Sequence, residues 1–542
     1  MGFRLPILIG FSILLFSALT IKLFHVQVLK GDYYAARAAS IHSLSKNLLP
    51  NRGNIFFSDR ENNAVPVSIN RQYPTIFVVP TEIKDVDEAV NFLKTITTED
   101  EISLKAKLSK SKDPYEPIIR RASGPQVKLV KEANIPGIDI DYEQGRFYPL
   151  ESVGAQTIGF VETGDRSVDG KYGAEKYYND ELNGKFGNIK GDKVQDAENG
   201  NNVYLTIDRN IQSESERILK NLVQDHKAQG GLVIIEEPST GKILAMAGNP
   251  TFNPNDYGSA EIKSFLNPTV ESVYEPGSIF KIFTMASGID AGKITPDTTF
   301  VDTGSLKLNG KTIKNWDLKA HGKVTMTNVI ELSLNTGAAF AERMLGNNPF
   351  YEYLKKFGFK NKTGIDLPGE VLGSLLPLEK DVREINFATA SFGQGVSVTP
   401  IGLITAMASI ANHGIMMKPY INKDSEPTIL GRTISAEASK QTIGMMVSAV
   451  DKAQIASIKG YAVAGKTGTA QVVDFKHGGY TNDVIDSYIG FAPAYNPKFI
   501  ILVRIDKPLG APHAAETVVP AFHDLAQFIL NYYNIAPDNI SN

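Results

Sequence analysis

The spacing of hydrophobic and polar residues changes along the chain and divides it into regions. The run Leu5–Ile21 contains no charged residue, and it reaches the length of a bilayer-spanning helix if Leu23–Leu29 continue it. A cleaved signal peptide is the alternative, but the residues after the run form a poor small-x-small cleavage site. We therefore expect an uncleaved anchor, with the rest of the chain on one side of the membrane because no second apolar run follows.

The region after the anchor carries structural signals but no catalytic ones. Arg52–Gly53 and Asp59–Arg60 bracket a short predicted strand. Residues 84–134 alternate charged positions with Leu, Val and Ile at helical spacing, which is typical of solvated amphipathic helices. The polar segment 188–201 is the best candidate for a domain boundary. We expect this region to form a stalk and a non-catalytic pedestal.

Beyond this boundary the pattern changes to buried strands and helices. Leu205–Asp208 predicts the cap of a helix that runs to about Asp225. Gly231–Ile235 and Lys242–Ala247 are apolar strands joined by the turn Pro238–Gly241, which predicts an antiparallel hairpin. This favours an α+β fold, an antiparallel sheet flanked by helices, over a doubly wound one. The predicted organisation is a transmembrane anchor at 1–28, a stalk and mixed α/β pedestal at 29–205, and a catalytic domain at 206–542.

A serine and a lysine share one face at the start of a predicted buried helix. Ser278 precedes the apolar run Ile279–Met285, and Lys281 lies three residues further on, so the two side chains project side by side. A lysine can activate a serine only if burial or a neighbouring cation lowers its pKa. By itself the Ser-x-x-Lys pattern favours a solvated helix pair, because it recurs at Ser43–Lys46, Ser109–Lys112 and Ser239–Lys242.

A second group of polar residues lies between helical stretches further along the chain. Ser333 could relay a proton, and Asn335 could hold Lys281 and a substrate amide in position. A single Ser-x-Asn is usually a loop cap, and the pattern also occurs at Ser45–Asn47 and Ser68–Asn70. Only its position relative to the other motifs gives it weight.

A third group lies in a stretch of small and β-branched residues, Val463–Val473, which predicts a strand open to an extended ligand. Lys466 supplies a cation, and Thr467 and Thr469 supply hydroxyls, as the binding of a carboxylate requires. Gly468 is expected to leave room for close approach of a substrate. A second Lys-Thr-Gly at 362–364 predicts a turn.

Composition removes several classes of function. The apolar fraction of 42% and the charged fraction of 21% are typical of globular proteins. A net charge of −3 gives no reason to expect a nucleic-acid partner. The 8 histidines lack paired ligand spacing and there is no cysteine, so we expect neither a metal nor a cofactor.

The ordered trio Ser278–Lys281, Ser333–Asn335 and Lys466–Gly468 resembles that of the penicillin-binding proteins, specifically the single-pass class B peptidoglycan transpeptidases. Two positions depart from the family pattern: Leu334 stands where small or polar residues are common, and Asp59–Arg60 is not followed by an early glycine. The resemblance covers nearly the whole length and also includes Arg52–Gly53, Asp59–Arg60, Arg146–Pro149, Gly173–Glu175, Pro238–Ala245, Ser391–Gly395 and Ile489–Pro493.

The resemblance implies a fold like that of penicillin-binding proteins and serine β-lactamases. It also implies a membrane-anchored, extracytoplasmic enzyme that cross-links peptidoglycan in division or elongation and is the target of β-lactams. Ser278 would attack the D-Ala-D-Ala bond of a stem peptide with Lys281 as base, while Ser333 and Asn335 would assist proton transfer. The expected partner is a polytopic glycosyltransferase in the membrane.

The resemblance also assigns the binding residues. Lys466, Thr467 and Thr469 would hold the terminal carboxylate beside Gly468. The backbone N–H groups of Ser278 and Thr469 would form the oxyanion hole.

Two alternatives share part of this pattern. A membrane-anchored β-lactamase has the same trio, but it would leave the pedestal unexplained and would hydrolyse its acyl-enzyme rapidly. A β-lactam sensor or inactive scaffold is the second alternative, although sensors typically carry several spans and one is predicted here. Roles in elongation, division and sporulation all remain compatible with these residues.

Overall fold

The computed structural model describes residues 13, 15–17, 19, 20, 22, 49–110, 115–163, 168–190, 193–380, 382–474, 477–510 and 513–538. Most of the predicted anchor and most of the stalk lie outside the described residues. None of the helices within these ranges combines the length and apolar character needed to cross a membrane. Contacts group the chain into two units, Met1–Gly53 with Asp180–Asn202, and Asn54–Asn179 with Val203–Asn542.

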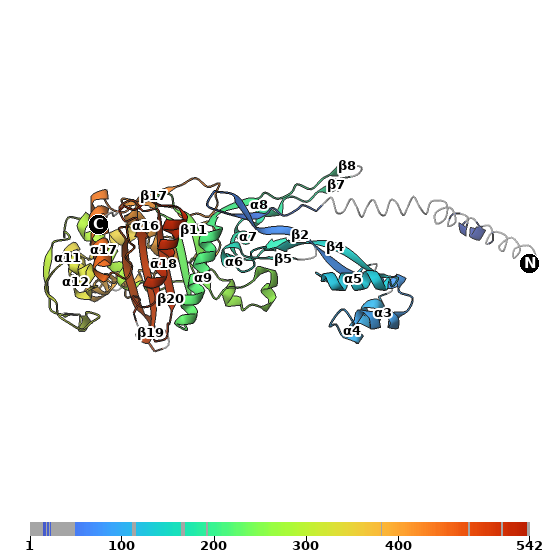
Figure 1. The fold of residues 1–542 in the computed structure, drawn as a ribbon, viewed down its shortest axis with the longest axis horizontal. Coiled ribbons are helices and arrows are strands. Elements are labelled where there is room, and N and C mark those ends of the chain that lie inside the picture. Colours follow the sequence, from blue (N-terminus) through green and yellow to red (C-terminus); the bar gives the residue numbers. More distant parts are fainter. Residues whose placement is uncertain are drawn as a thin grey trace, which may run out of the picture. The chain divides into compact units, whose positions relative to one another are not determined.

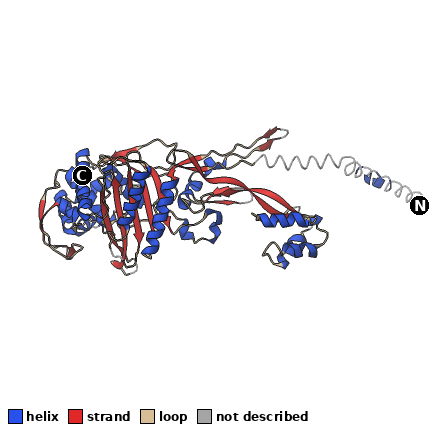
Figure 2. Ribbon diagram, in the orientation of Figure 1, coloured by secondary structure: helices blue, strands red, loops and turns tan. Residues whose placement is uncertain are grey.

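A five-stranded antiparallel sheet forms the framework of the C-terminal region, in the order β11-β10-β20-β19-β18. Figure 1 shows this sheet, and Figure 2 shows its strands beside helices. The predicted hairpin around Pro238–Gly241 is confirmed, since its strands pair antiparallel from Gly231 with Asn249 to Glu237 with Lys242. The strands are β10 (Gly230–Glu237), β11 (Lys242–Asn249), β18 (Ala464–Val473), β19 (Tyr480–Ala492) and β20 (Phe499–Asp506).

Helices cover both faces of this sheet because its central strands are apolar on both sides. On one face, α9 (Arg209–Asp225) and α18 (Val518–Tyr532) pack in a core that includes Val233 and Ile235 of β10. Side chains alternate along a strand, so Ile234 and Glu236 point to the other face, where Thr405 of α16 (Pro400–Ala411) reaches Glu236. The sheet is therefore a buried central layer.

The predicted helix after Leu205 begins where its cap was expected. The Asp208 carboxylate accepts hydrogen bonds from Asn210 N at 2.9 Å and Ile211 N at 3.1 Å. Both donors are first-turn N–H groups that have no partner within the helix.

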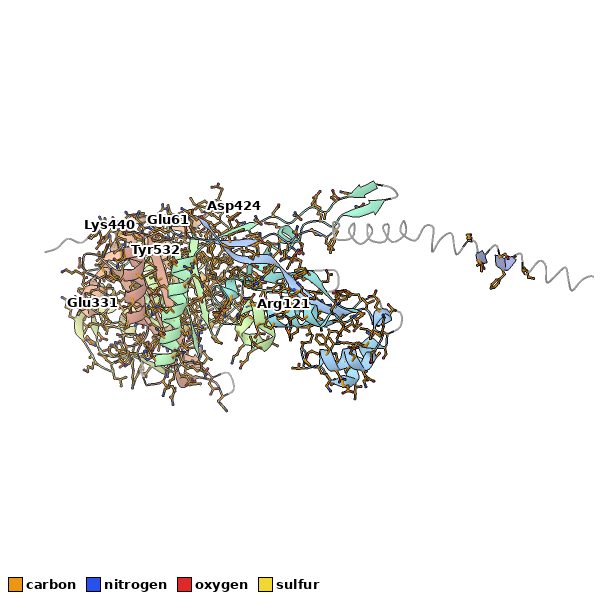
Figure 3. The ribbon with its side chains drawn as sticks, turned by 45° about the vertical axis from the view of Figure 1, so that its right-hand side comes forward. Glu61, Arg121, Glu331, Asp424, Lys440 and Tyr532 are labelled. Atoms are coloured by element: carbon orange, nitrogen blue, oxygen red, sulfur yellow. The ribbon has the colours of Figure 1, made fainter. Side chains whose placement is uncertain are left out.

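A helical region beside the sheet surrounds one fully buried helix, α10 (Phe280–Asp290), which the short 3₁₀ helix η5 (Gly277–Ile279) precedes. All residues of α10 from Phe280 to Ile289 are buried. On α11, Glu331 accepts from Ser448 Oγ at 2.6 Å and pairs with Lys452 Nζ at 2.8 Å, which fastens α11 to α17; Figure 3 labels Glu331. The helices here are α11 (Met326–Glu331), α12 (Asn335–Leu345), α13 (Asn347–Lys356), α14 (Leu376–Lys380), α15 (Glu384–Ala390) and α17 (Ala436–Ala453).

The pedestal contains a second sheet. The predicted short strand is confirmed as β1 (Ile55–Ser58), which pairs antiparallel with β2 and parallel with β9 (Val203–Asp208). Residues 84–134 form three helices, as expected, and also a strand that the periodicity did not reveal. The remaining elements of this part are β2 (Ala64–Val78), α3 (Val86–Leu93), α4 (Glu101–Leu108), β3 (Glu116–Ile119), α5 (Gly124–Ala133) and β4 (Ile138–Phe147).

A buried ion pair organises the pedestal. Arg146 Nε lies 2.7 Å from Glu175 Oε1, and Ser68 Oγ donates to the same oxygen at 2.6 Å. Because β9 runs through residue 205, the boundary at that position stays a prediction.

Short elements complete the described fold. They are η2 (Pro80–Glu82), α6 (Ala155–Ile158), β5 (Val161–Thr163), β6 (Val168–Gly170), α7 (Gly173–Tyr177), α8 (Asn179–Asn183), β7 (Asn188–Lys190), β8 (Lys193–Gln195), η3 (Pro254–Ser259), η4 (Ile262–Phe265), β12 (Thr299–Asp302), β13 (Ser305–Leu308), β14 (Lys311–Lys314), β15 (Gly322–Thr325), β16 (Ile415–Met417) and β17 (Ile429–Arg432).

Candidate active site

The backbone before α10 brings Ser278 beside strand β18. Gly277 has a φ of +54°, in the region that favours glycine, and a Cβ there would lie 3.0 Å from Thr469 O. The half-buried Ser278 therefore follows a residue whose conformation and close contact both require the absence of a side chain. The Pro-Gly pair before the serine has a direct structural purpose.

Lys281 is fully buried on α10, and its amine contacts Ser333. Its Nζ donates to Ser333 O at 2.6 Å and to Ser333 Oγ at 3.1 Å. Burial, and then the charge of Lys466, hold the pKa of Lys281 well below its ordinary value. The uncharged amine is thus favoured, which is the form that a general base requires. Catalytic hydrogen bonds are often longer before substrate binds, so the contacts of Lys281 with Ser333 leave its role toward Ser278 open.

Ser333 occupies the turn between α11 and α12 in a left-handed conformation, with a φ of +55°. Its Oγ lies 3.1 Å from Lys281 Nζ and 3.1 Å from Lys466 Nζ. A hydroxyl that accepts from two amines still has its own proton to donate. This geometry brings the three predicted motifs together through one oxygen atom.

Lys466 belongs to the buried face of the edge strand β18. Besides Ser333, its Nζ contacts Thr467 Oγ1 at 3.2 Å and Thr467 O at 3.3 Å. Burial lowers the pKa of Lys466 to about 8, so the amine remains mostly charged at neutral pH. The side chains of Thr467 and Thr469 alternate to the more exposed face, where an extended ligand could lie along the strand.

Packing gives a structural reason for a glycine at position 468. A Cβ at this position would lie 2.6 Å from Ser487 Oγ and 2.7 Å from Pro276 O. The close approach is between β18 and the residues that precede Ser278, so the space left by the missing side chain is filled by protein. The expectation that Gly468 lets a substrate approach closely stays a prediction.

Thr469 is held by a residue that the motifs did not indicate. Its Oγ1 donates to Asp486 Oδ1 at 3.0 Å and accepts from Ala514 N at 3.3 Å. Asp486 is buried, which raises the pKa of its carboxyl, and Thr517 Oγ1 donates to its other oxygen at 2.9 Å. No local sequence signal identifies Asp486, because the β18–β19 register places it opposite Thr469.

Asn335 begins α12 near Ser333, but its side chain makes a different contact from the one expected. Its Nδ2 donates to Lys314 O at 2.9 Å, whereas Lys281 Nζ donates to Ser333 O and Oγ. The expectation that Asn335 holds Lys281 is therefore corrected for this structure. Its use toward a substrate amide stays a prediction.

An exposed aromatic pair lies next to these residues. Trp316, the single tryptophan of the chain, donates from Nε1 to Leu332 O at 3.0 Å. Its ring contacts the ring of His513 edge to face, with centroids 5.7 Å apart. In the sequence, the only indication of this aromatic pair is a single tryptophan in a polar loop.

The other copies of the motifs have structural explanations. Lys362 is exposed in a loop, and Thr363 and Gly364 donate to Glu370. Residues 362–364 form an irregular loop, and the assigned turn lies further on, at 368–369. Ser239 lies in the β10–β11 turn, and the Ser43–Lys46 and Ser45–Asn47 copies lie outside the described residues. Within the described ranges, no three His, Asp or Glu side chains are grouped to hold a metal ion.

Comparisons with known proteins agree with this geometry. A family model described as penicillin binding protein transpeptidase domain matches residues 231–526, and one described as penicillin-binding protein dimerisation domain matches residues 47–218. The chain is 33% identical to stage V sporulation protein D of Bacillus subtilis, over 95% of this chain and 83% of that protein. It is 27% identical to the peptidoglycan D,D-transpeptidase FtsI of Escherichia coli, over 100% of this chain and 93% of that protein.

A solved structure supports the fold. Penicillin binding protein 2X from Streptococcus thermophilus aligns with a TM-score of 0.74 and 22% identity, covering 90% of this chain and 81% of that one.

Proposed function

The chain belongs to the penicillin-binding protein transpeptidase family, and from this premise we propose that it is a peptidoglycan D,D-transpeptidase with Ser278 as its nucleophile. The observation that carries the assignment of roles is Ser333 Oγ, which lies 3.1 Å from the amines of both Lys281 and Lys466. One hydroxyl between a buried amine whose pKa is lowered and the cation of Lys466 can move protons in either direction.

The first step forms an acyl-enzyme. Lys281 Nζ takes the proton of Ser278 Oγ, and the oxygen attacks the carbonyl carbon between the two D-alanines. The backbone N–H groups of Ser278 and Thr469 stabilise the resulting oxyanion. When the C–N bond breaks, the leaving D-alanine nitrogen takes a proton through Ser333 Oγ, which Lys281 restores.

The second step transfers the acyl group. An amine of a neighbouring strand attacks the ester carbon, and its released proton passes to Lys281. The C–O bond breaks, and Ser278 Oγ recovers its proton. The product is an amide cross-link, with no net change in protons.

Substrate recognition relies on the charge beside the nucleophile. Lys466 would attract the terminal carboxylate, and the Thr467 hydroxyl would donate a hydrogen bond to it. The Thr469 hydroxyl would donate to it as well after its proton turns away from Asp486. Because Lys466 is buried, water screens its charge poorly. Its attraction for a carboxylate is therefore stronger than the attraction within a surface ion pair. Asn335 would position a substrate amide.

Covalent labelling tests the nucleophile. We expect penicillin to acylate Ser278 alone, and Ser278→Ala to fold normally without taking up label, as judged by mass spectrometry of digested protein. Ser239→Ala is the matched control, since Ser239 also precedes a lysine by three residues but lies in an exposed turn. A labelled Ser278→Ala protein would contradict the assignment, whereas rapid release of hydrolysed drug would favour a β-lactamase.

The placement of the protein in the cell is a further part of the proposal. Residues 1–28 would form a single membrane anchor, 29–205 a stalk and pedestal, and 206–542 the extracytoplasmic catalytic domain, with a polytopic glycosyltransferase as partner. Protease added to intact spheroplasts should digest the region after residue 50. Its full protection would refute this topology.

A further inference from the structure

The only proton of the Thr469 hydroxyl is engaged by the protein, although this residue lies where the peptide carboxylate is proposed to bind. Its Oγ1 donates to Asp486 Oδ1 at 3.0 Å and accepts from Ala514 N at 3.3 Å. A hydroxyl has one proton and two lone pairs, so the position left on this oxygen is a lone pair. A lone pair repels a carboxylate. Thr469 must therefore release its proton from Asp486 before it can donate to the ligand.

The carboxylate of Asp486 would be poorly compensated if the Thr469 hydroxyl simply turned away. Asp486 is fully buried, and its other oxygen accepts from Thr517 Oγ1 at 2.9 Å. Without the Thr469 proton, the first oxygen would face the lone pairs of that hydroxyl, which is costly for a buried group. The ligand also brings a second negative charge. Burial already raises the pKa of the Asp486 carboxyl, and both of these changes raise it further.

Two histidines interact electrostatically with Asp486 from the elements packed against β19. They are His513, in the loop before α18, and His226, at the end of α9, and both oppose the rise of its pKa. Side chains alternate along a strand, so the charged residues of β18, β19 and β20 near this position point to the other face of the sheet. These are Lys466, Asp483, Arg504 and Asp506.

We propose that Asp486 is a positioning residue that links carboxylate binding at Thr469 to the uptake of one proton. Thr469 Oγ1 gives its proton to Asp486 Oδ1 and receives one from a hydronium ion, so one proton is bound for each carboxylate. The 3.0 Å contact then runs from the Asp486 O–H to Thr469 Oγ1, and the threonine donates to the ligand. The inference rests on the proposed function, which places a carboxylate at this threonine.

Two ligands that differ in one carboxylate test this linkage: benzylpenicillin and its methyl ester. Taking the ratio of their second-order rate constants for acylation cancels the titration of Lys281, which serves both reactions. Between pH 5 and 7 the ligand carboxylate and Lys466 both stay charged, since the pKa of Lys466 is about 8. We expect the ratio to be about tenfold higher at pH 5 than at pH 7, because linkage to one proton allows at most tenfold per pH unit.

Two variants separate this role from a structural one. Asp486→Asn should give the high ratio at both pH values, because an asparagine amide donates to Thr469 Oγ1 as a protonated carboxyl would. Thr469→Val should give a low ratio at both pH values, because the hydroxyl is absent. A structural role for Asp486 predicts instead that Asp486→Asn slows both ligands and leaves the dependence of the ratio on pH unchanged.

Histidine side chains ordinarily change charge between pH 5 and 8, so His513 needs a variant of its own. His513→Gln should keep the wild-type dependence on pH, and its loss in this variant alone would assign the effect to the histidine and overturn the proposal. The matched control is Asp483→Asn, which removes a charge from the same strand. Asp483 lies on the opposite face, 3.2 Å from Lys507 Nζ, so the wild-type dependence should persist.

Proton uptake gives a reading that does not depend on rates. At pH 6.5 in unbuffered solution with a pH indicator, stoichiometric acylation by benzylpenicillin should bind more protons in the wild type than in Asp486→Asn, by up to one per enzyme. Equal uptake, a wild-type ratio that does not change with pH, or a dependence that persists in Asp486→Asn overturns the proposal. Thermal melts check folding, and Thr469→Val replaces Asp486→Asn in these comparisons if the latter does not fold.

Penicillin labelling of the wild type separates the two ideas. Absent labelling refutes the proposed function, whereas labelling with the same dependence on pH in the wild type and in Asp486→Asn refutes only the linkage.

Discussion

At the scale of single residues, burial gives Lys466 and Lys362 different roles although each precedes a Thr-Gly pair. Lys466 is 4% exposed and contacts Ser333 Oγ, whereas Lys362 is exposed in a loop. We expect the rate constant of acylation by penicillin to be about 10²-fold lower, or more, in Lys466→Ala, because one preorganised electrostatic contact is lost. Lys362→Ala should change it by less than about threefold, as is usual for surface substitutions.

The measurement is second-order acylation of both variants after their thermal melts have been matched. A crippled Lys362→Ala protein would contradict the placement of the third motif.

Some site residues could be predicted from the sequence because they lie in local motifs, whereas others could not because strand pairing brings them to the site. Ser278, Lys281, Ser333 and Lys466 carry recognisable spacing, and the amines of Lys281 and Lys466 both contact Ser333 Oγ in the structure. Asp486 carries no such signal, because its contact with Thr469 depends on strand register.

At the scale of elements, the contact between β18 and the turn before α10 sets the geometry of the site. A Cβ on Gly468 would meet Ser487 Oγ and Pro276 O at 2.6 and 2.7 Å. We expect Gly468→Ala to lower the free energy of unfolding by about 1–3 kcal/mol, as overpacking does, and to slow acylation by displacing Ser278. Gly444→Ala on α17 is the control, because its Cβ would meet no atom within 4 Å and alanine favours a helix.

Thermal melts and penicillin acylation measure both effects. Equal stability of Gly468→Ala and the wild type would show that the strand and the turn can move apart without cost.

Elements with strong patterns were predictable, and those fixed by distant partners were not. The apolar strands on either side of Pro238–Gly241 have the turn residues of a hairpin, and the carboxylate of Asp208 marks the start of α9. Strand β3 (Glu116–Ile119) lies among helical periodicity and owes its conformation to pairing with β2, which no local signal reveals.

At the scale of the whole molecule, buried glutamates make stability depend on pH. Burial raises the pKa of Glu236 to about 8, and those of Glu216 and Glu342 to about 7. Each is lifted above its unfolded value, so the stability that its protonated form contributes is complete below about pH 4.5 and is lost as pH rises through the folded pKa. We expect the melting temperature to fall between pH 5 and 8.5, because the free energy of unfolding decreases by at most about 1.4 kcal/mol per pH unit for each group.

Glu236→Gln should reduce this fall but not abolish it, because the other two glutamates remain. Glu61→Gln should keep the wild-type slope, because Glu61, labelled in Figure 3, is exposed. An unchanged slope in Glu236→Gln would mean that water or a cation reaches this carboxylate.

The parallel pairing of β1 with β9 has a mechanical consequence. The predicted anchor precedes the first residue of β1 in the chain, and the last residue of β9 caps α9 beside the catalytic sheet. In a parallel pair these two points lie at opposite ends, so tension between them loads the inter-strand hydrogen bonds together, in shear, instead of opening them one at a time. An enzyme fixed at one end and bound to a stretched polymer at the other would resist that pull at this strand pair.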